Sequence, residues 1–206
     1  VYEPQNGWGV DTKSIGGVKD WGPILSSING APIVSLRRTF SYETDIIVTP
    51  EIPESVTDMY MTFWNCTKIT NAPTIPNGIV NLDETFKECT ALTSLPDLSN
   101  CTKLTSLKWT FSGCTSITDA SDFVIPSGVT KLEDTFHGTG LVNSGMPTIP
   151  NTVTELYETF ASCKSLTDLS GFTIPSSVTS LSHAFRFCTA LVKAPTIPNS
   201  VTNLSR

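Results

Sequence analysis

Apolar and polar positions recur along the chain with a period of 23–25 residues, far longer than the period of a helix or a strand. Each unit is anchored by a Phe that follows Thr or, once, Ala, and apolar residues stand four and seven positions before that Phe. The seven anchors are Phe40, Phe63, Phe86, Phe111, Phe136, Phe160 and Phe185. Short β-branched segments separated by Pro, Gly and Asn lie between them, a pattern typical of strands and turns.

Two further positions repeat in the same frame. Cys stands three residues after Phe in five units, at Cys66, Cys89, Cys114, Cys163 and Cys188, named here the column cysteines. An Ile-Pro pair opens most units, and its Pro is expected to end a strand and turn the chain. A unit this short cannot enclose a core, whereas stacked copies bury one continuous core. We therefore predict a repeat solenoid, mainly β with short strands and turns, with coils about 4.8 Å apart and one internal column of Phe rings.

The repeat also divides the chain. Residues 31–206 hold about seven repeats of 23–25 residues, and we expect their C-terminal end to be uncapped. Residues 1–30 do not repeat and contain Trp8, Trp21 and six glycines. The first coil of a solenoid exposes apolar core unless another segment covers it. Residues 1–30 are therefore interpreted as an N-terminal cap or, alternatively, as an attachment segment.

The frame resembles the leucine-rich repeats of the BspA-like bacterial surface-protein family, and similar repeats occur in phage structural proteins. The best matches run from Ile174-Pro175-Ser176-Ser177-Val178-Thr179 through Ala184-Phe185 to Cys188, and over Ile197-Pro198-Asn199-Ser200-Val201-Thr202. The chain departs from the family pattern because Thr replaces Ala before Phe in six of seven units. The resemblance implies a leucine-rich-repeat-like, right-handed stack of coils and an adhesion-type or surface role.

Composition and charge exclude several classes of protein. The 206 residues are 39% hydrophobic, which is enough for a continuous core and excludes wholesale disorder. Lys and Arg number 13 against 19 Asp and Glu, giving a net charge of −6 and a pI near 4.8. This acidic balance argues against nucleic acid and an anionic membrane surface as partners. No apolar run approaches the roughly 20 residues of a membrane span, so no membrane insertion is expected.

The cysteines and threonines are interpreted as structural. Zinc sites use closely paired ligands such as C-x2-C, but the column cysteines stand one repeat apart. We expect them to be buried, free thiols acting as small hydrophobes, although adjacent coils leave disulfide pairing geometrically open. Cys101 lies off the column and is expected to be the most exposed cysteine. The Thr before Phe is expected to hydrogen-bond backbone groups between coils.

No catalytic constellation is found in the sequence. The only two histidines, His137 and His183, stand two repeats apart and share no motif with a Ser or Cys nucleophile. Two acidic doublets, Asp83-Glu84 and Glu133-Asp134, occupy the same repeat position two coils apart, which places them about 10 Å from each other along the rod. We interpret this position as part of a solvated face. The sequence therefore predicts no enzyme, no catalytic residue, no cofactor and no metal ligand.

The positions flanking Thr-Phe change in every coil while the frame positions hardly change. Packing fixes the frame, and nothing in the predicted fold fixes the flanking positions, so they are either a binding face or neutral drift on a solvated face. Aromatic residues there are typical of recognition surfaces. The candidate binding face comprises the aromatic residues Tyr60, Trp64, Trp109 and Tyr157 together with Arg37, Arg38, Asp83, Glu84, Glu133, Asp134 and His183.

Two functions remain open from the sequence. The first is an extracellular binding or adhesion module, displayed on a bacterial cell or a virion, that recognises a protein or a glycan through the variable face. The second is a structural spacer or fibre segment that associates with copies of itself or with neighbouring domains through the ends of the solenoid.

Overall fold

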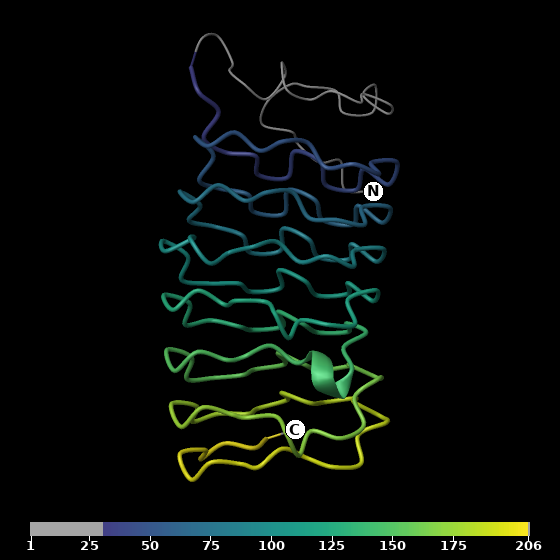
Figure 1. Cartoon of the computed structure of the whole chain (residues 1–206), viewed down its shortest axis with the longest axis vertical. Coiled ribbons are helices and arrows are strands. Elements are labelled where there is room, and N and C mark those ends of the chain that lie inside the picture. The colour runs from purple at the N-terminus through teal and green to yellow at the C-terminus, as the bar shows by residue number, and fades with distance from the viewer. Residues whose placement is uncertain (1–30, 206) are drawn as a thin grey trace.

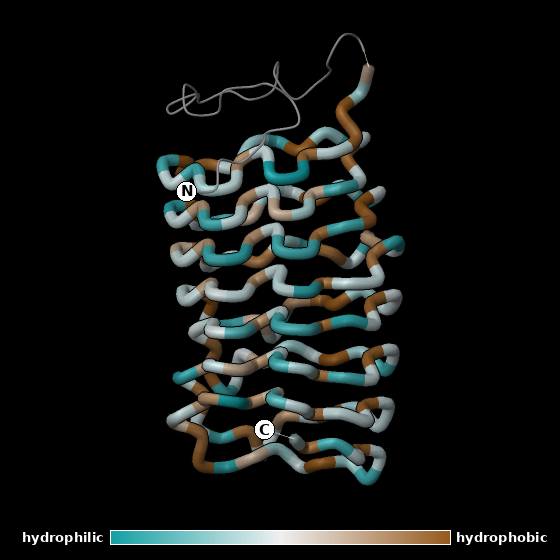
Figure 2. Tube along the Cα trace, turned by 180° about the vertical axis from the view of Figure 1, so that it is seen from behind, coloured by the Kyte–Doolittle hydropathy of each residue, from teal (hydrophilic) through white to brown (hydrophobic). Residues whose placement is uncertain are grey.

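The computed structural model describes residues 31–205, which form an elongated stack of coils (Figure 1). Each coil contains one of the seven anchor Phe residues, and apolar and polar segments alternate along each turn of the chain (Figure 2). The predicted solenoid is confirmed by this arrangement. The predicted cap at residues 1–30 lies outside the described residues.

Regular secondary structure is sparse in the described part of the chain. The 3-10 helix η2 (Asn143–Gly145) is the only helical element over residues 31–205. Neighbouring coils pair through isolated parallel β-bridges, such as Ser35 with Asp58 and Ser180 with Asn203. The parallel pairing agrees with the sequence prediction, but the mainly-β character is not confirmed because these bridges do not extend into strands.

Backbone hydrogen bonds nevertheless join each coil to the next around the anchor Phe. In the first two described coils the donors are the N–H groups of Leu36, Arg38, Phe40 and Tyr42, and the acceptors are the carbonyls of Asp58, Tyr60, Thr62 and Trp64, at 2.7–2.9 Å. Every second N–H therefore points toward the next coil. Most later coils repeat this pattern, so the stack is held by a ladder that runs along its axis.

This ladder requires an unusual backbone. The residue two positions before Phe has a positive φ of 48–58° in all seven coils: Arg38, Met61, Glu84, Trp109, Asp134, Glu158 and His183. The residue two positions after Phe is also left-handed, and it is Gly in only two coils, at Gly113 and Gly138. Left-handed non-Gly residues cost roughly 1–2 kcal/mol each. Repetition of this geometry in every coil shows that the inter-coil hydrogen bonds impose it.

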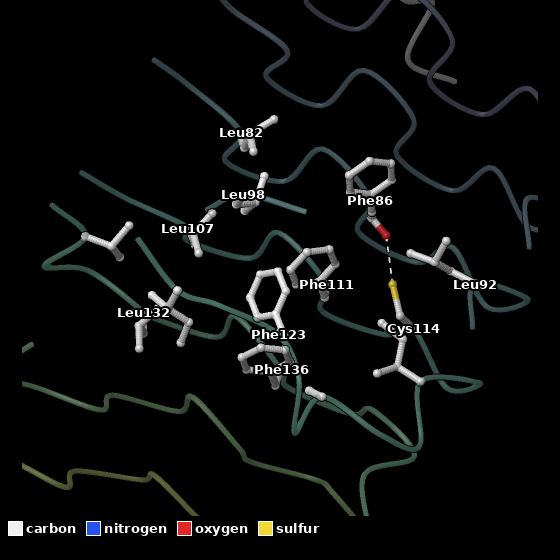
Figure 3. Close-up of a cluster of buried hydrophobic side chains, with 14 of the residues drawn as sticks. Leu82, Phe86, Leu92, Leu98, Leu107, Phe111, Cys114, Phe123, Leu132 and Phe136 are labelled. Atoms are coloured by element: carbon white, nitrogen blue, oxygen red, sulfur yellow. Dashed lines mark hydrogen bonds between the residues drawn. The ribbon is translucent and has the colours of Figure 1, made fainter. Parts of the chain in front are cut away.

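The anchor Phe rings form one continuous internal column, as predicted. Consecutive ring centres are 5.4–5.9 Å apart, and the ring planes differ by 5–23°. Phe111 is fully buried between Phe86 and Phe136, and Phe123 meets it edge-on at 5.5 Å (Figure 3). Apolar frame residues such as Leu107 and Leu132 pack beside the column.

The threonines before Phe confirm the predicted inter-coil ladder. Five buried Thr hydroxyls, those of Thr62, Thr85, Thr110, Thr135 and Thr159, each donate to a backbone carbonyl of the preceding coil at 2.7–3.1 Å. The acceptor is always the residue four positions before the preceding Phe. Each of these carbonyls also accepts the backbone N–H three residues later in its own coil, so the Thr hydroxyl adds a second hydrogen bond that links the two coils.

The column cysteines, three residues after Phe, also form hydrogen bonds between neighbouring coils. All five are buried and free, and each thiol donates to the carbonyl of the Phe in the preceding coil at 2.9–3.2 Å. The bond from Cys114 to Phe86 is drawn in Figure 3. In one of the two units that lack Cys at this position, Thr139 is buried and donates to the carbonyl of Phe136.

The Ile-Pro pairs close turns, as predicted. The carbonyl of each Pro accepts the N–H of the apolar residue three positions later, for example from Val56 to Pro53 at 2.9 Å. Cys101 stands ten residues before Phe111, where other units carry this Pro, and its carbonyl accepts from Leu104 in the same way. The expectation that Cys101 is exposed is wrong. Its exposed fraction is 1%, because the Pro position of the coil faces the core.

Candidate binding surface

The variable residues gather along one side of the Phe column because equivalent positions of successive coils lie side by side. We define the variable stripe as the residues three before, two before and one after each anchor Phe. It comprises Arg37, Arg38, Ser41, Tyr60, Met61, Trp64, Asp83, Glu84, Lys87, Lys108, Trp109, Ser112, Glu133, Asp134, His137, Tyr157, Glu158, Ala161, Ser182, His183 and Arg186. The left-handed residue of each coil lies in the middle of this stripe.

At the N-terminal end, two arginines surround one tyrosine of the next coil. The guanidinium carbons of Arg37 and Arg38 lie 4.5 and 5.7 Å from the centre of the Tyr60 ring. Arg37 also pairs with Asp58 at 2.9 Å, and the Tyr60 hydroxyl donates to Glu84 at 3.1 Å. Burial and the nearby Glu84 carboxylate raise the pKa of Tyr60, so its hydroxyl stays a donor at neutral pH.

In the middle, one lysine lies between two tryptophans from the coils on either side. The Lys87 ammonium is 5.5 Å from the Trp64 ring centre and 4.1 Å from the Trp109 ring centre. It also pairs with Glu84 at 3.1 Å. Cation–π contacts of this kind contribute about 0.5–2 kcal/mol each. The Lys87 ammonium therefore contacts both indole rings at once and restrains them.

The acidic doublets Asp83-Glu84 and Glu133-Asp134 occupy the same repeat position two coils apart, but their surroundings differ. The Asp83 carboxylate accepts from the Ser106 hydroxyl at 2.7 Å and from the backbone N–H of Lys108 at 3.0 Å. Burial raises the pKa of Asp83 despite these bonds. In the doublet, Glu133 pairs with the Lys108 side chain, and this hydrogen bond raises the pKa of Lys108.

Toward the C-terminal end, His137 lies among two carboxylates and an indole. Its Nδ1 is 2.9 Å from Asp134 and 3.6 Å from Glu158, and its ring stacks on Trp109 with centres 6.4 Å apart. The hydrogen bond to Asp134 raises the pKa of His137. Burial raises the pKa of Asp134.

The other histidine lies beside the last aromatic residue of the stripe. His183 meets the Tyr157 ring edge-on, with centres 5.6 Å apart, and its Nδ1 is 3.0 Å from the hydroxyl of Ser182. That hydroxyl also bonds to Ser205 at 2.9 Å. Tyr157 is the most exposed aromatic candidate, with an exposed fraction of 38%.

The stripe is less exposed than the sequence predicted. Tyr60, Trp64 and Trp109 are half-buried against neighbouring side chains, and Asp83 and Glu84 are half-buried as well. The expectation that both acidic doublets lie on a solvated face is wrong for Asp134, whose exposed fraction is 1%. Burial follows from contacts between coils, which cover the stripe residues with the side chains of the coils on either side. The stripe is a semi-buried, pre-ordered surface.

The sequence analysis did not reveal that His137 and Glu158 lie next to each other. They occupy different repeat positions, one after Phe and two before it, and therefore look unrelated along the chain. An alignment of successive units at the anchor Phe could have shown this proximity, because it places His137 and Glu158 in neighbouring coils close to the same Phe column. The prediction of no metal ligand did not consider this pairing of unlike positions.

A cavity of about 280 Å³ lies where one unit has lost its Ile-Pro pair. Its lining residues are Leu95, Pro96, Asp97, Asp119, Ala120, Asp122, Phe123 and Val124. The carboxylates of Asp97 and Asp119 accept the N–H groups of Ser99 and Ser121, each at 2.9 Å. These hydrogen bonds lower the pKa of both groups. Both carboxylates therefore shape local turns at the edge of the cavity.

The family model described as BspA type leucine rich repeat region matches the sequence of this chain in six copies, over residues 37–137 and 83–206. The chain belongs to this BspA-type leucine-rich repeat family. Leucine-rich repeat proteins of this kind are generally non-enzymatic, and the family indicates a repeat module for protein interaction or surface display. Over residues 31–205, no helix has the length and apolar character of a membrane span.

A solved structure has a similar fold. The Treponema pallidum leucine-rich repeat protein TpLRR has a TM-score of 0.55 and 23% identity, and the match covers 69% of this chain but only 64% of that one. A Bacteroides ovatus leucine-rich repeat protein has a TM-score of 0.47 and 18% identity, and the match covers 83% of this chain and 43% of that one. A leucine-rich cell surface protein from Faecalibacterium prausnitzii has a TM-score of 0.32 and 18% identity, and the match covers 86% of this chain and 81% of that one. A search of curated proteins gives no match.

Proposed function

We propose that this BspA-type repeat array is an extracellular, non-enzymatic binding module that recognises a protein or glycan through the variable stripe. The observation that carries the proposal is the continuous chain of aromatic and charged contacts across successive coils. Lys87 between Trp64 and Trp109 is its centre. Family membership supports surface display and protein interaction.

The chemistry of the stripe suits recognition for two reasons. Large aromatic side chains bury much area on binding and lose little conformational entropy, since they have only two side-chain torsions. Here they are also held by neighbouring cations and carboxylates, so less ordering remains to be done when a ligand binds. The charges of Arg37, Arg38 and Glu133 would set partner choice and association rate more than affinity.

The test is a binding screen against a glycan array and a panel of purified cell-surface proteins. For a ligand that is found, replacement of Tyr60, Trp64, Trp109 and Tyr157 by Ala is expected to weaken binding by more than about a hundredfold, since central aromatic residues contribute about 2 kcal/mol or more each. The matched control is Val34→Ser with Val80→Ser, two exposed apolar residues outside the stripe. Equal affinity of the aromatic variant and the parent would refute recognition by the stripe.

A further inference from the structure

Three side chains of the variable stripe present metal-ligand atoms to one another. Asp134 and His137 come from one coil and Glu158 from the next, and their candidate ligand atoms all lie within 4.8 Å of one another. His137 Nδ1 is 2.9 Å from Asp134 Oδ1 and 3.6 Å from Glu158 Oε2. Zinc bonds of about 2.0–2.2 Å in a tetrahedral site place ligand atoms about 3.3 Å apart. The two measured distances bracket that spacing.

The two carboxylates of the group are also sheltered from solvent. The side chain of Asp134 is 1% exposed and that of Glu158 is 15% exposed. One basic side chain faces the group, because Arg186 pairs with the Oε1 atom of Glu158 at 3.8 Å, whereas Lys108 pairs with Glu133 outside it. Two sheltered carboxylates and one imidazole form a mixed N/O ligand set, which a divalent cation neutralises better than a single proton does.

We propose that Asp134, His137 and Glu158 bind one Zn²⁺ ion, with the fourth position open to water. One imidazole and two carboxylates with an open position resemble the three-ligand sets that keep zinc accessible. Zn²⁺ would replace the proton that joins His137 Nδ1 to Asp134, so binding releases that proton. The proposal does not depend on ligand recognition by the rest of the stripe.

The surroundings hold the ligands in place. Trp109 stacks on the His137 ring with planes 18° apart, which fixes the ring orientation. Asp134 lies in the left-handed position of its coil, and its N–H donates to the carbonyl of Tyr157 in the next coil. Glu158 occupies the equivalent position of that next coil. The ladder between coils therefore sets the spacing between the two carboxylates.

The experiment is isothermal titration calorimetry of the chelator-treated chain with ZnCl2 at neutral pH. We expect binding of one ion per chain, in the micromolar range or tighter. His137→Ala should abolish it, and Glu158→Gln should weaken it by more than about tenfold, since even partners outside the ligand set change metal affinity that much. His183→Ala removes the only other histidine and should leave affinity unchanged.

Thermal melting of each variant without metal establishes that it is folded. Zn²⁺ should raise the melting temperature of the parent and of the His183→Ala variant, because an ion that binds only the folded state stabilises it. Absence of saturable binding to the parent would overturn the proposal. Equal affinity in the parent and both ligand variants, with both folded, would overturn it as well.

Discussion

Replacing Thr135 by Val tests whether the buried hydroxyls between coils stabilise the stack. Thr135 is fully buried, and its hydroxyl donates to the Leu107 carbonyl at 2.8 Å. Val has nearly the same shape but no donor, so the variant removes one hydrogen bond without opening a void. The Leu107 carbonyl keeps a second bond from the Thr110 N–H at 3.2 Å. The expected loss is therefore about 0.5–1.5 kcal/mol, the net contribution of one hydrogen bond whose acceptor keeps another partner.

The assay is equilibrium unfolding in urea, followed by the change in tryptophan fluorescence. The matched control is Thr130→Val, since Thr130 is exposed and its hydroxyl makes a longer contact of 3.3 Å with the Thr105 carbonyl. A surface change of this kind should alter stability by no more than about 0.5 kcal/mol. If Thr135→Val is as stable as the parent, the hydroxyl ladder does not hold the coils together, and Thr recurs there for its shape alone.

Three further predictions concern the core. Phe111→Ala should destabilise by about 3–5 kcal/mol in urea unfolding because its neighbours Phe86 and Phe136 cannot close the void, and a parent-like midpoint would contradict the stacked column. Gly145→Ala should cost about 1–3 kcal/mol because a Cβ there would lie 2.5 Å from the Thr118 carbonyl, whereas Gly171→Ala, with open space around it, is the neutral control. Burial raises the pKa of the column cysteines, to about 12 for Cys89 and Cys163. Their contribution to stability is complete below about pH 8.5, where unfolded thiols are protonated, and falls above it by about 1.4 kcal/mol per pH unit for each thiol. Unfolding midpoints measured from pH 7 to 10 under reducing conditions check this, and rapid thiol labelling of the native chain at pH 8 would argue against burial.

The aromatic and frame residues show how much a repeat sequence reveals about its own core. Phe111, Thr135 and Cys114 can be assigned to inner columns from the repeat pattern alone, because each recurs at one position in most units. In a solenoid each coil packs only on its neighbours, so a position that packs in one coil packs in all of them. The burial of these residues was therefore determined by the sequence.

Other features were decided only when the coils were brought into register. Residue type gives no sign that Trp109 is left-handed, because the backbone ladder between coils imposes that geometry. Cys101 is buried because it takes the inward-facing turn position of Pro, which the frame of cysteines did not reveal. The proximity of His137 to Glu158 likewise depends on two different repeat positions meeting between neighbouring coils. Sequence periodicity determines which positions face inward, whereas contacts between unlike positions depend on backbone geometry that only the stacked chain supplies.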